Sequence, residues 1–131
     1  MTARATNMKV YDLNKIQNDE INSSYLRKVI YGEALSIAKV EVNAGQVTQI
    51  HSHETEEVIY VLKGCWLFHL PDGDVVLREN QMLCIPTGTE HSSEALEDTV
   101  ALDICSKNRA DWISGQDRAL HGNPDQFLWA V

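Results

Sequence analysis

Residues 45–64 read GQVTQIHSHETEEVIYVLKG, and this stretch decides how the rest of the sequence is interpreted. In a strand, side chains two positions apart share a face and lie about 6.6 Å apart, which groups His51 and His53 with Gln49. A second, very apolar strand begins at Glu57. Two imidazoles at this spacing reach one ion at metal–nitrogen distances of about 2.1 Å, and a carboxylate from the next strand adds a third ligand. The stretch therefore predicts two strands that hold a metal ion.

His91 is the expected fourth ligand, because it ends the turn-like segment PTGTEH at residues 86–91. One histidine on the surface of an acidic protein is usually solvated. Three histidines and a glutamate at ligand spacing, flanked by glycines, do not fit that explanation. His69 and His121 lie outside this pattern, so we do not expect them to bind the ion.

Two spaced motifs in the chain resemble the motifs of the cupin family. They are Gly45-x5-His51-x-His53-x3-Glu57-x6-Gly64 and Asn80-x5-Pro86-x-Gly88-x2-His91. Asn80 stands where the family usually has Gly, and Asn also tolerates positive φ. Ala95 stands where the family often has Asn, at a position that is not a metal ligand. The resemblance covers residues 25–105 and implies an all-β, single-domain cupin barrel, also called a double-stranded β-helix or jelly roll.

Short strand-like runs separated by turn signals indicate the same class independently, since they are typical of sandwiches and barrels. One clear hairpin turn is PDGD at residues 71–74. We expect an N-terminal strand and arm over residues 1–24, with the strand at 8–13. The barrel is expected over residues 25–107, and a C-terminal helix and tail over 108–131.

The C-terminal segment is expected to start with a short helix that is capped by Asn108 and ends near Gly115. The residues after it read as an extended tail whose apolar end is FLW at 127–129. We expect this tail to pack on the barrel or on a partner. Because open sheets leave unpaired backbone groups at their edges, the chain is expected to pair as a homodimer through edge strands.

Composition limits the possible functions of the chain. Its 131 residues are 44% hydrophobic and carry a net charge of −8, with no polybasic run. Nucleic acids and anionic membranes are therefore not expected partners. No secretory signal is visible at the start. Cys65, Cys84 and Cys105 are predicted to be buried free thiols in a cytoplasmic protein.

The strand at residues 99–105 and the segment after it resemble the pectin-degradation cupins that ketonise unsaturated monouronates. In that family an Asp on this strand, an aromatic residue and an Arg serve the substrate. The resemblance implies these roles for Asp103 and Arg109. Cys105 occupies the aromatic position, and Glu57 stands where those proteins often carry Gln.

The ligand set of three imidazoles and one carboxylate suits Zn, Ni, Mn, Fe or Co and does not select among them. We expect metal-assisted acid/base chemistry on a small substrate that carries a carboxylate or a carbonyl group. Asp103 would transfer the proton and Arg109 would bind a carboxylate bidentately. Tautomerisation, cyclisation and lyase reactions all fit. Three alternatives are an Fe(II) dioxygenase, a natural-product tailoring enzyme such as a polyketide cyclase, and a non-catalytic small-molecule binder.

Overall fold

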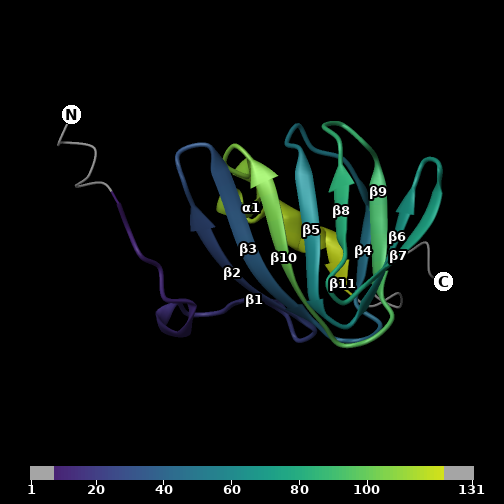
Figure 1. Ribbon diagram of the computed structural model, residues 1–131, viewed down its shortest axis with the longest axis horizontal. Coiled ribbons are helices and arrows are strands. Elements are labelled where there is room, and N and C mark those ends of the chain that lie inside the picture. The colour runs from purple at the N-terminus through teal and green to yellow at the C-terminus, as the bar shows by residue number, and fades with distance from the viewer. Residues whose placement is uncertain (1–7, 123–131) are drawn as a thin grey trace.

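Two antiparallel β-sheets pack face to face in this chain (Figure 1). The computed structural model describes residues 8–122. One sheet has six strands in the order β1 (Asp19–Asn22), β2 (Tyr25–Tyr31), β3 (Leu35–Val42), β10 (Thr99–Ser106), β5 (Glu57–Lys63) and β8 (Met82–Ile85). The other has five, in the order β11 (His121–Gly122), β4 (Val47–His51), β9 (His91–Ala95), β6 (Cys65–Leu70) and β7 (Gly73–Arg78). The predicted all-β cupin architecture is confirmed.

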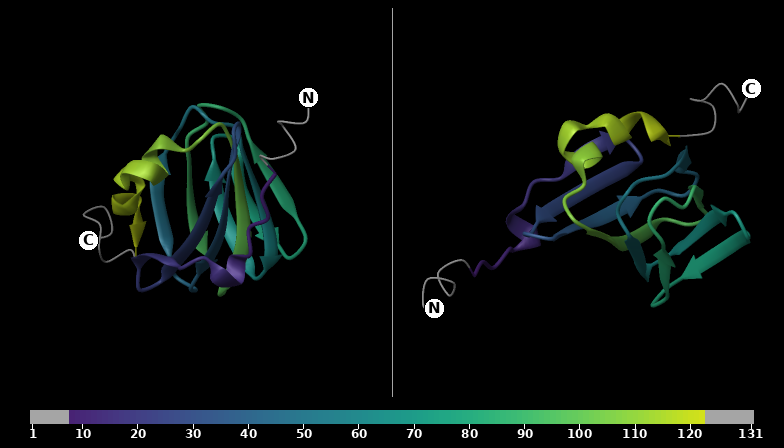
Figure 2. Two further views of the ribbon diagram at one scale, coloured as in Figure 1. Left: turned by 90° about the vertical axis from the view of Figure 1, so that its left-hand side faces the viewer. Right: turned by 90° about the horizontal axis from the view of Figure 1, so that it is seen from above.

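The C-terminal segment closes one side of the sandwich. It consists of the short helix α1 (Ala110–Ser114), the 3-10 helix η3 (Gln116–Leu120) and β11. In Figure 2 it lies between the two sheets where they diverge. β11 pairs with β4 of one sheet and contacts β1 of the other, so residues near the end of the chain join both sheets.

Alternation along β10 shows how the sequence builds the core. Thr99, Ala101, Asp103 and Cys105 are buried, and the residues between them are half-buried on the outer face. β3 packs beside it with the same alternation. Most inward residues of these two strands are small, so larger inward side chains from other elements fill the interior. They include Trp66, Phe68, Leu77 and Trp112.

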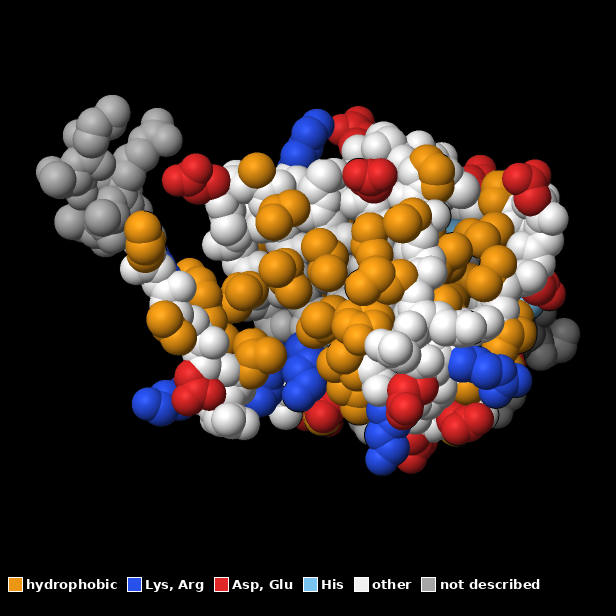
Figure 3. Space-filling model, viewed as in Figure 1, with side chains coloured by type: hydrophobic (Ala, Val, Ile, Leu, Met, Phe, Trp, Pro, Cys, Tyr) orange, Lys and Arg blue, Asp and Glu red, His pale blue; other side chains and the backbone are white. Residues whose placement is uncertain are grey.

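The outer face of the six-stranded sheet is also rich in apolar side chains (Figure 3). Among them, Leu35 is 48% exposed and Met82 is 61% exposed. A continuous apolar area on a sheet face of a protein with net charge −8 is unusual. This face is therefore available for contact with another molecule.

Most of the strands predicted between residues 25 and 106 are confirmed, but the N-terminal prediction is wrong. Residues 8–12 form no strand, and Met8 and Val10 are largely exposed. They have no neighbouring strand to pair with. The first strand is β1, which pairs with β2 and lies after the strand predicted at residues 8–13. The 3-10 helix η2 (Leu13–Lys15) precedes it, capped by Asp12.

The start of the C-terminal segment also differs from the prediction. Asn108 does not cap α1, because the cap residue is Arg109, whose backbone N–H donates to Ser36 Oγ at 2.9 Å. The predicted end at Gly115 is confirmed by its left-handed φ of 80°. Beyond Gly115 the chain forms η3 and β11 rather than an extended tail. The apolar stretch at residues 127–129 lies outside the described residues.

The cysteine prediction holds at two of the three positions. Cys65 and Cys105 are buried free thiols, whereas Cys84 is exposed. On β8 the alternation turns Ile85 inward and Cys84 outward, and β8 is an edge strand of its sheet. The apolar character of the run therefore did not predict which face the thiol occupies.

Gly64 is a conformational requirement of the fold. It joins β5 to β6 with φ of 107°, and a Cβ there would lie 2.7 Å from Thr99 Cα and collide with the Asp98 carbonyl oxygen. Gly45 has a φ of 90°, but a Cβ there would meet nothing within 4 Å. The two glycines share an unusual φ and differ in the space around them.

We predict that Gly64→Ala lowers the free energy of unfolding by more than about 3 kcal/mol, since it adds a backbone collision to the cost of positive φ. The matched control Gly45→Ala pays the conformational cost alone and loses about 1–2 kcal/mol. Chemical denaturation of both variants measures the difference. Equal losses would show that φ strain, and not the close approach to β10, makes Gly64 necessary.

Candidate metal centre

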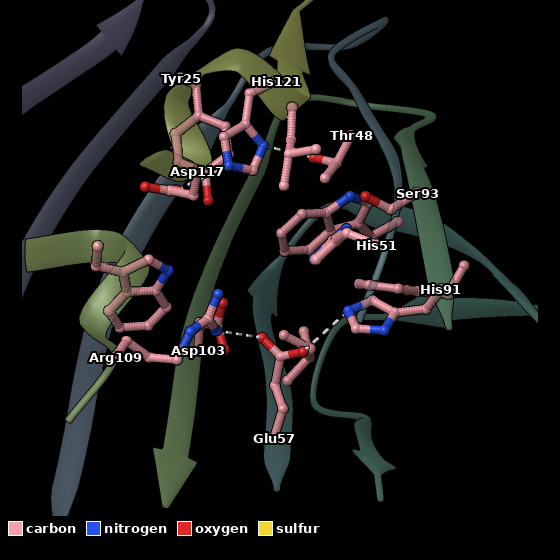
Figure 4. Close-up of a pocket in the computed structure, with 15 residues that line it drawn as sticks. Tyr25, Thr48, His51, Glu57, His91, Ser93, Asp103, Arg109, Asp117 and His121 are labelled. Carbon is pink, nitrogen blue, oxygen red and sulfur yellow. Dashed lines mark hydrogen bonds and ion pairs between the residues drawn. The ribbon is translucent and has the colours of Figure 1, made fainter. Parts of the chain in front are cut away.

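Three histidines meet where β4 and β9 lie side by side. His51 ends β4, His91 begins β9, and the two are register partners. His53 follows in the loop between β4 and β5. One ring nitrogen of each lies close enough to the others for all three to share an ion. Figure 4 shows His51 and His91 at one wall of the pocket with Glu57 below them.

Backbone carbonyl groups orient all three rings in the same way. Nδ1 of His51, His53 and His91 lies 2.8, 3.0 and 2.9 Å from the carbonyl oxygens of residues 49, 55 and 89. A carbonyl oxygen only accepts hydrogen bonds, so each Nδ1 carries the proton. In the neutral ring the lone pair is then on Nε2. This tautomer can bind a metal through Nε2. Burial lowers the pKa of His51 to about 4, so this ring is neutral at pH 7.

Glu57 faces two of these Nε2 atoms. Its Oε1 lies 3.2 Å from Nε2 of His53 and 3.2 Å from Nε2 of His91. With neutral rings these contacts place acceptor against acceptor, and a proton or a metal cation between them removes the repulsion. Burial acts to lower the pKa of His91, but the bond to Glu57 raises it overall. The four side chains are thus arranged to bind positive charge.

A β-bulge changes which residues share the face of the histidines. Thr48 pairs with Ser93 and His51 pairs with His91, so β4 has one residue more than β9 between these pairs. Regular alternation predicted Gln49 beside His51. Instead Thr48 is buried in the pocket, and the Gln49 side chain points to Ala119 O at 3.5 Å.

A second group of side chains adjoins Glu57 on the other side. Asp103 and Cys105 on β10 have acceptor atoms within 4.8 Å of it and of each other. Burial, and then the charge of Glu57, raises the pKa of Asp103 well above its ordinary value. Although burial would raise the pKa of Glu57, hydrogen bonds from Asp103 and the histidines hold it well below its usual range. When the pair shares one proton, Asp103 therefore holds it and Glu57 is the carboxylate.

Arg109 reaches the same group from the C-terminal segment. Its Nε and Nη2 donate to the two carboxylate oxygens of Asp111, both at 2.7 Å. Its Nη1 lies 3.2 Å from Cys105 Sγ and 3.6 Å from Glu57 Oε2, and its guanidinium stacks on Trp112. Because Asp111 occupies one edge of the guanidinium, Nη1 is the group directed at the buried cluster. The expected bidentate contact of Arg109 with a substrate is not available through the edge that Asp111 holds.

The two remaining histidines have different positions. His69 is exposed and bonded to Asp74 at 2.7 Å. His121 lines the same pocket as His51 and His91, but it contacts Thr48 and Asp117 and is not grouped with the other three histidines. Asp117 and His121 line the pocket but were not predicted from the sequence to do so. In the sequence, the one feature that connects these two residues is their separation by four positions, within a segment that was predicted to be an extended tail.

The pocket is lined from both sheets and from the C-terminal segment. Its free volume is about 30 Å³, close to the size of one or two water molecules. Besides the polar groups, Ile59, Trp66, Phe68, Trp112 and Leu120 form its walls. Free space of this size holds an ion and a water-sized group, so a substrate of several carbons must displace lining side chains.

A family model for the cupin domain matches residues 38–105. The chain belongs to the cupin family. The matched region includes every residue of the three-histidine group and of the Glu57–Asp103–Cys105 group. Arg109, Asp117 and His121 lie beyond it, in the segment that closes the sandwich.

Solved cupin structures share the fold. KdgF from Halomonas sp. superposes with a TM-score of 0.75 at 23% identity, covering 81% of this chain and 99% of that one. Ectoine synthase from P. lautus gives 0.73 at 14% identity, covering 84% and 87%. At these identities the likeness shows the fold alone.

One curated relative matches in sequence. The 3-hydroxyanthranilate 3,4-dioxygenase of Neurospora crassa is 31% identical over 70 residues, which is 50% of this cupin and 39% of the relative. The chain thus spans about two fifths of the length of that protein. Among the helices within residues 8–122, none is long and apolar enough to cross a membrane.

We predict that the double variant His51→Ala, His53→Ala loses its metal. Two of the nitrogen ligands disappear, so affinity should fall by more than about 100-fold, the upper end of what loss of one supporting residue costs. Elemental analysis of the purified protein measures the metal content. The control is His69→Ala, which removes an exposed imidazole and should keep the wild-type content. Full metal content in the double variant would refute the site.

Proposed function

We propose that this cupin is an enzyme whose divalent transition metal is held by His51, His53, Glu57 and His91. The observation that carries the proposal is the contact of two Nε2 lone pairs with one carboxylate oxygen at 3.2 Å. A cation at this point converts a repulsive arrangement into a ligand set. The set of three nitrogens and one oxygen suits Zn, Ni, Mn, Fe or Co. When bound, such an ion supplies Lewis acidity to a carbonyl or a water.

Asp103 is proposed as the acid/base of the reaction. Its carboxyl group is buried and lines the pocket, and burial and the charge of Glu57 raise its pKa well above the ordinary value. A carboxyl group with a raised pKa can hold a proton, donate it to a substrate atom and take it back, which is the requirement for general acid/base catalysis. Tautomerisation, cyclisation and lyase reactions each need this transfer.

Arg109 is proposed to bind the substrate through Nη1. Burial alone would lower the pKa of this guanidinium, but the hydrogen bonds to Asp111 and the nearby acidic groups raise it, so it stays charged. Asp111 and the ring of Trp112 hold it in place. A fixed cation at the edge of the pocket recognises a carboxylate. The proposed substrate is therefore a small molecule with a carboxylate or carbonyl group.

An Fe(II)-dependent dioxygenase is the second candidate, and the 31% identity to the Neurospora crassa dioxygenase favours it. The two proposals differ in their need for O₂. Purified protein loaded with one metal at a time should be screened against small carboxylates and carbonyl compounds with and without O₂. Turnover without O₂ supports acid/base chemistry, and turnover that requires O₂ supports the dioxygenase. Turnover on larger apolar substrates alone would indicate a tailoring enzyme such as a polyketide cyclase, and binding without turnover a non-catalytic cupin.

We predict that Asp103→Asn lowers turnover by about 10²–10⁴-fold, the typical contribution of a general acid/base. The amide still donates a hydrogen bond to Glu57 as the protonated acid does, so metal content and melting temperature should stay close to wild type. Asp74→Asn on the protein surface is the matched control. An unchanged rate would make Asp103 structural, and a sharp loss of stability would assign it to holding Glu57 in place.

We also propose that the chain forms a homodimer in which the outer face of the six-stranded sheet contributes to the interface. The side chains that β10 turns to this face are Val100, Leu102 and Ile104, and Leu35 and Met82 are well exposed on it. When two copies pair through this face, the apolar surface of one contacts the apolar surface of the other. A protein with net charge −8 avoids repulsion by pairing through a region where acidic residues are sparse.

We predict that light scattering gives twice the chain mass of 14.7 kDa for the wild type and the chain mass itself for Leu102→Lys. A lysine at the centre of the face places like charges against each other across a two-fold interface. Val76→Lys, on the other sheet, is the control and should remain dimeric. A monomeric wild type at micromolar concentration would refute the assembly.

A further inference from the structure

The bulge in β4 creates a second polar layer in the pocket, next to the metal-binding histidines. Ser93 is two residues along β9 from His91, so it lies about 6.6 Å further along the same face. Thr48 is its register partner, and His121 is the register partner of Thr48 on β11. Figure 4 shows Thr48 and His121 at the opposite end of the pocket from Glu57. The pair of His51 and His91 is the next layer along the strands.

A directional chain of hydrogen bonds runs through this layer. Arg27 donates to both carboxylate oxygens of Asp117, at 2.5 and 3.3 Å. Asp117 also lies 3.1 Å from Nε2 of His121, and Nδ1 of His121 lies 2.7 Å from Thr48 Oγ1. Arg27 and Asp117 are almost completely buried. Although burial would raise the pKa of Asp117, bonds from His121 and Arg27 hold it far below its usual range, so it is a carboxylate.

The direction of each bond follows from this charge state. A carboxylate only accepts, so Nε2 of His121 carries a proton and donates it to Asp117. Arg27 already places a cation 2.5 Å from Asp117, and we assign the ring the single Nε2 proton that its contact with this carboxylate requires. Its Nδ1 is then an acceptor, and the Thr48 hydroxyl donates to it. Among residues 8–122, Thr48 Oγ1 has no other hydrogen-bond partner, so it presents lone pairs to the pocket.

We propose that Thr48, oriented by the chain through His121 and Asp117 to Arg27, is a binding subsite for a hydroxyl group of the substrate. The subsite accepts the hydrogen of that hydroxyl. The indole N–H of Trp66 lines the same pocket, is buried and has no acceptor among the described residues. It supplies a donor for the hydroxyl oxygen. One acceptor and one donor together match the two hydrogen-bonding functions of an alcohol.

This inference rests on the proposed function, because the other end of the substrate is held by the metal. It narrows the substrate to a hydroxy acid or a hydroxy carbonyl compound. The layer of Thr48 and Ser93 lies two residues along β9 from His91, so a substrate that reaches both layers must span about 6.6 Å. Four-carbon and five-carbon chains span this distance. A site that bonds a substrate hydroxyl discriminates against the analogue that lacks it, because its own polar groups are then left unpaired.

The test compares 4-hydroxybutanoate with butanoate as ligands of the zinc-loaded protein, using NMR or calorimetric titration. Wild type should bind the hydroxy acid about tenfold more tightly. Thr48→Val keeps the branched shape and removes the acceptor, so the two affinities should become equal while butanoate binding stays unchanged. Thr48→Ser should restore the preference. Equal affinities in wild type, or an undiminished preference in Thr48→Val, would overturn the subsite.

Nitrogen-15 NMR of the histidine rings tests the hydrogen-bond chain without any ligand. His121, assigned by its loss in His121→Gln, should be a neutral ring with the proton on Nε2 at pH 7.5. A charged ring or a proton on Nδ1 would overturn the proposed direction and the subsite with it. If neither carboxylate binds wild type although zinc is bound, the proposed substrate class fails. The His121 tautomer measured by NMR then still tests the direction of the hydrogen-bond chain.

Discussion

A buried carboxylate that is surrounded by acceptors is the constraint on which this structure depends. Glu57 faces the lone pairs of two imidazoles on one side and a second carboxyl group and a thiol on the other. Leaving an ionised carboxylate unpaired in a protein interior is costly. It is stabilised here by positive charge from one side, through a metal or a histidine proton, and by Arg109 and the proton of Asp103 from the other.

The strands supply this arrangement because they meet at one level of the sandwich. Glu57 begins β5, and its register partner on β10 is Cys105. His51 and His91 are partners across β4 and β9 in the opposite sheet. Small inward residues on β3 and β10, such as Ala38 and Ala101, leave the interior to the aromatic side chains and the polar cluster. The histidines of β4 and β9 therefore face Glu57 and Asp103, which come from the opposite sheet, and the side chains converge between the two sheets.

The C-terminal segment adds what the two sheets lack. It brings Arg109 to the Glu57 side of the pocket, and Asp117 and His121 to the other side. Arg27, from β2, is buried against Asp117 and lies 5.3 Å from the Trp112 ring, so the segment is held by charge as well as by apolar packing. The result is a narrow pocket with two polar ends and aromatic walls.

Much of this protein was determined by local sequence. The two motifs predicted the strands, the ligand spacing and the cupin architecture, because strand period, turn chemistry and metal geometry are all short-range rules. Asn80 takes φ of 66°, as its substitution for a glycine required. Tertiary structure decided the rest. Pairing with β9 introduced the bulge that turned Thr48 inward and Gln49 outward, and alternation on an edge strand exposed Cys84. The partnership of Arg27 with Asp117, 90 residues away, depends on how the segment after β10 folds back across the sandwich. No periodicity within one strand encodes contacts of that range, because they depend on which strands become neighbours.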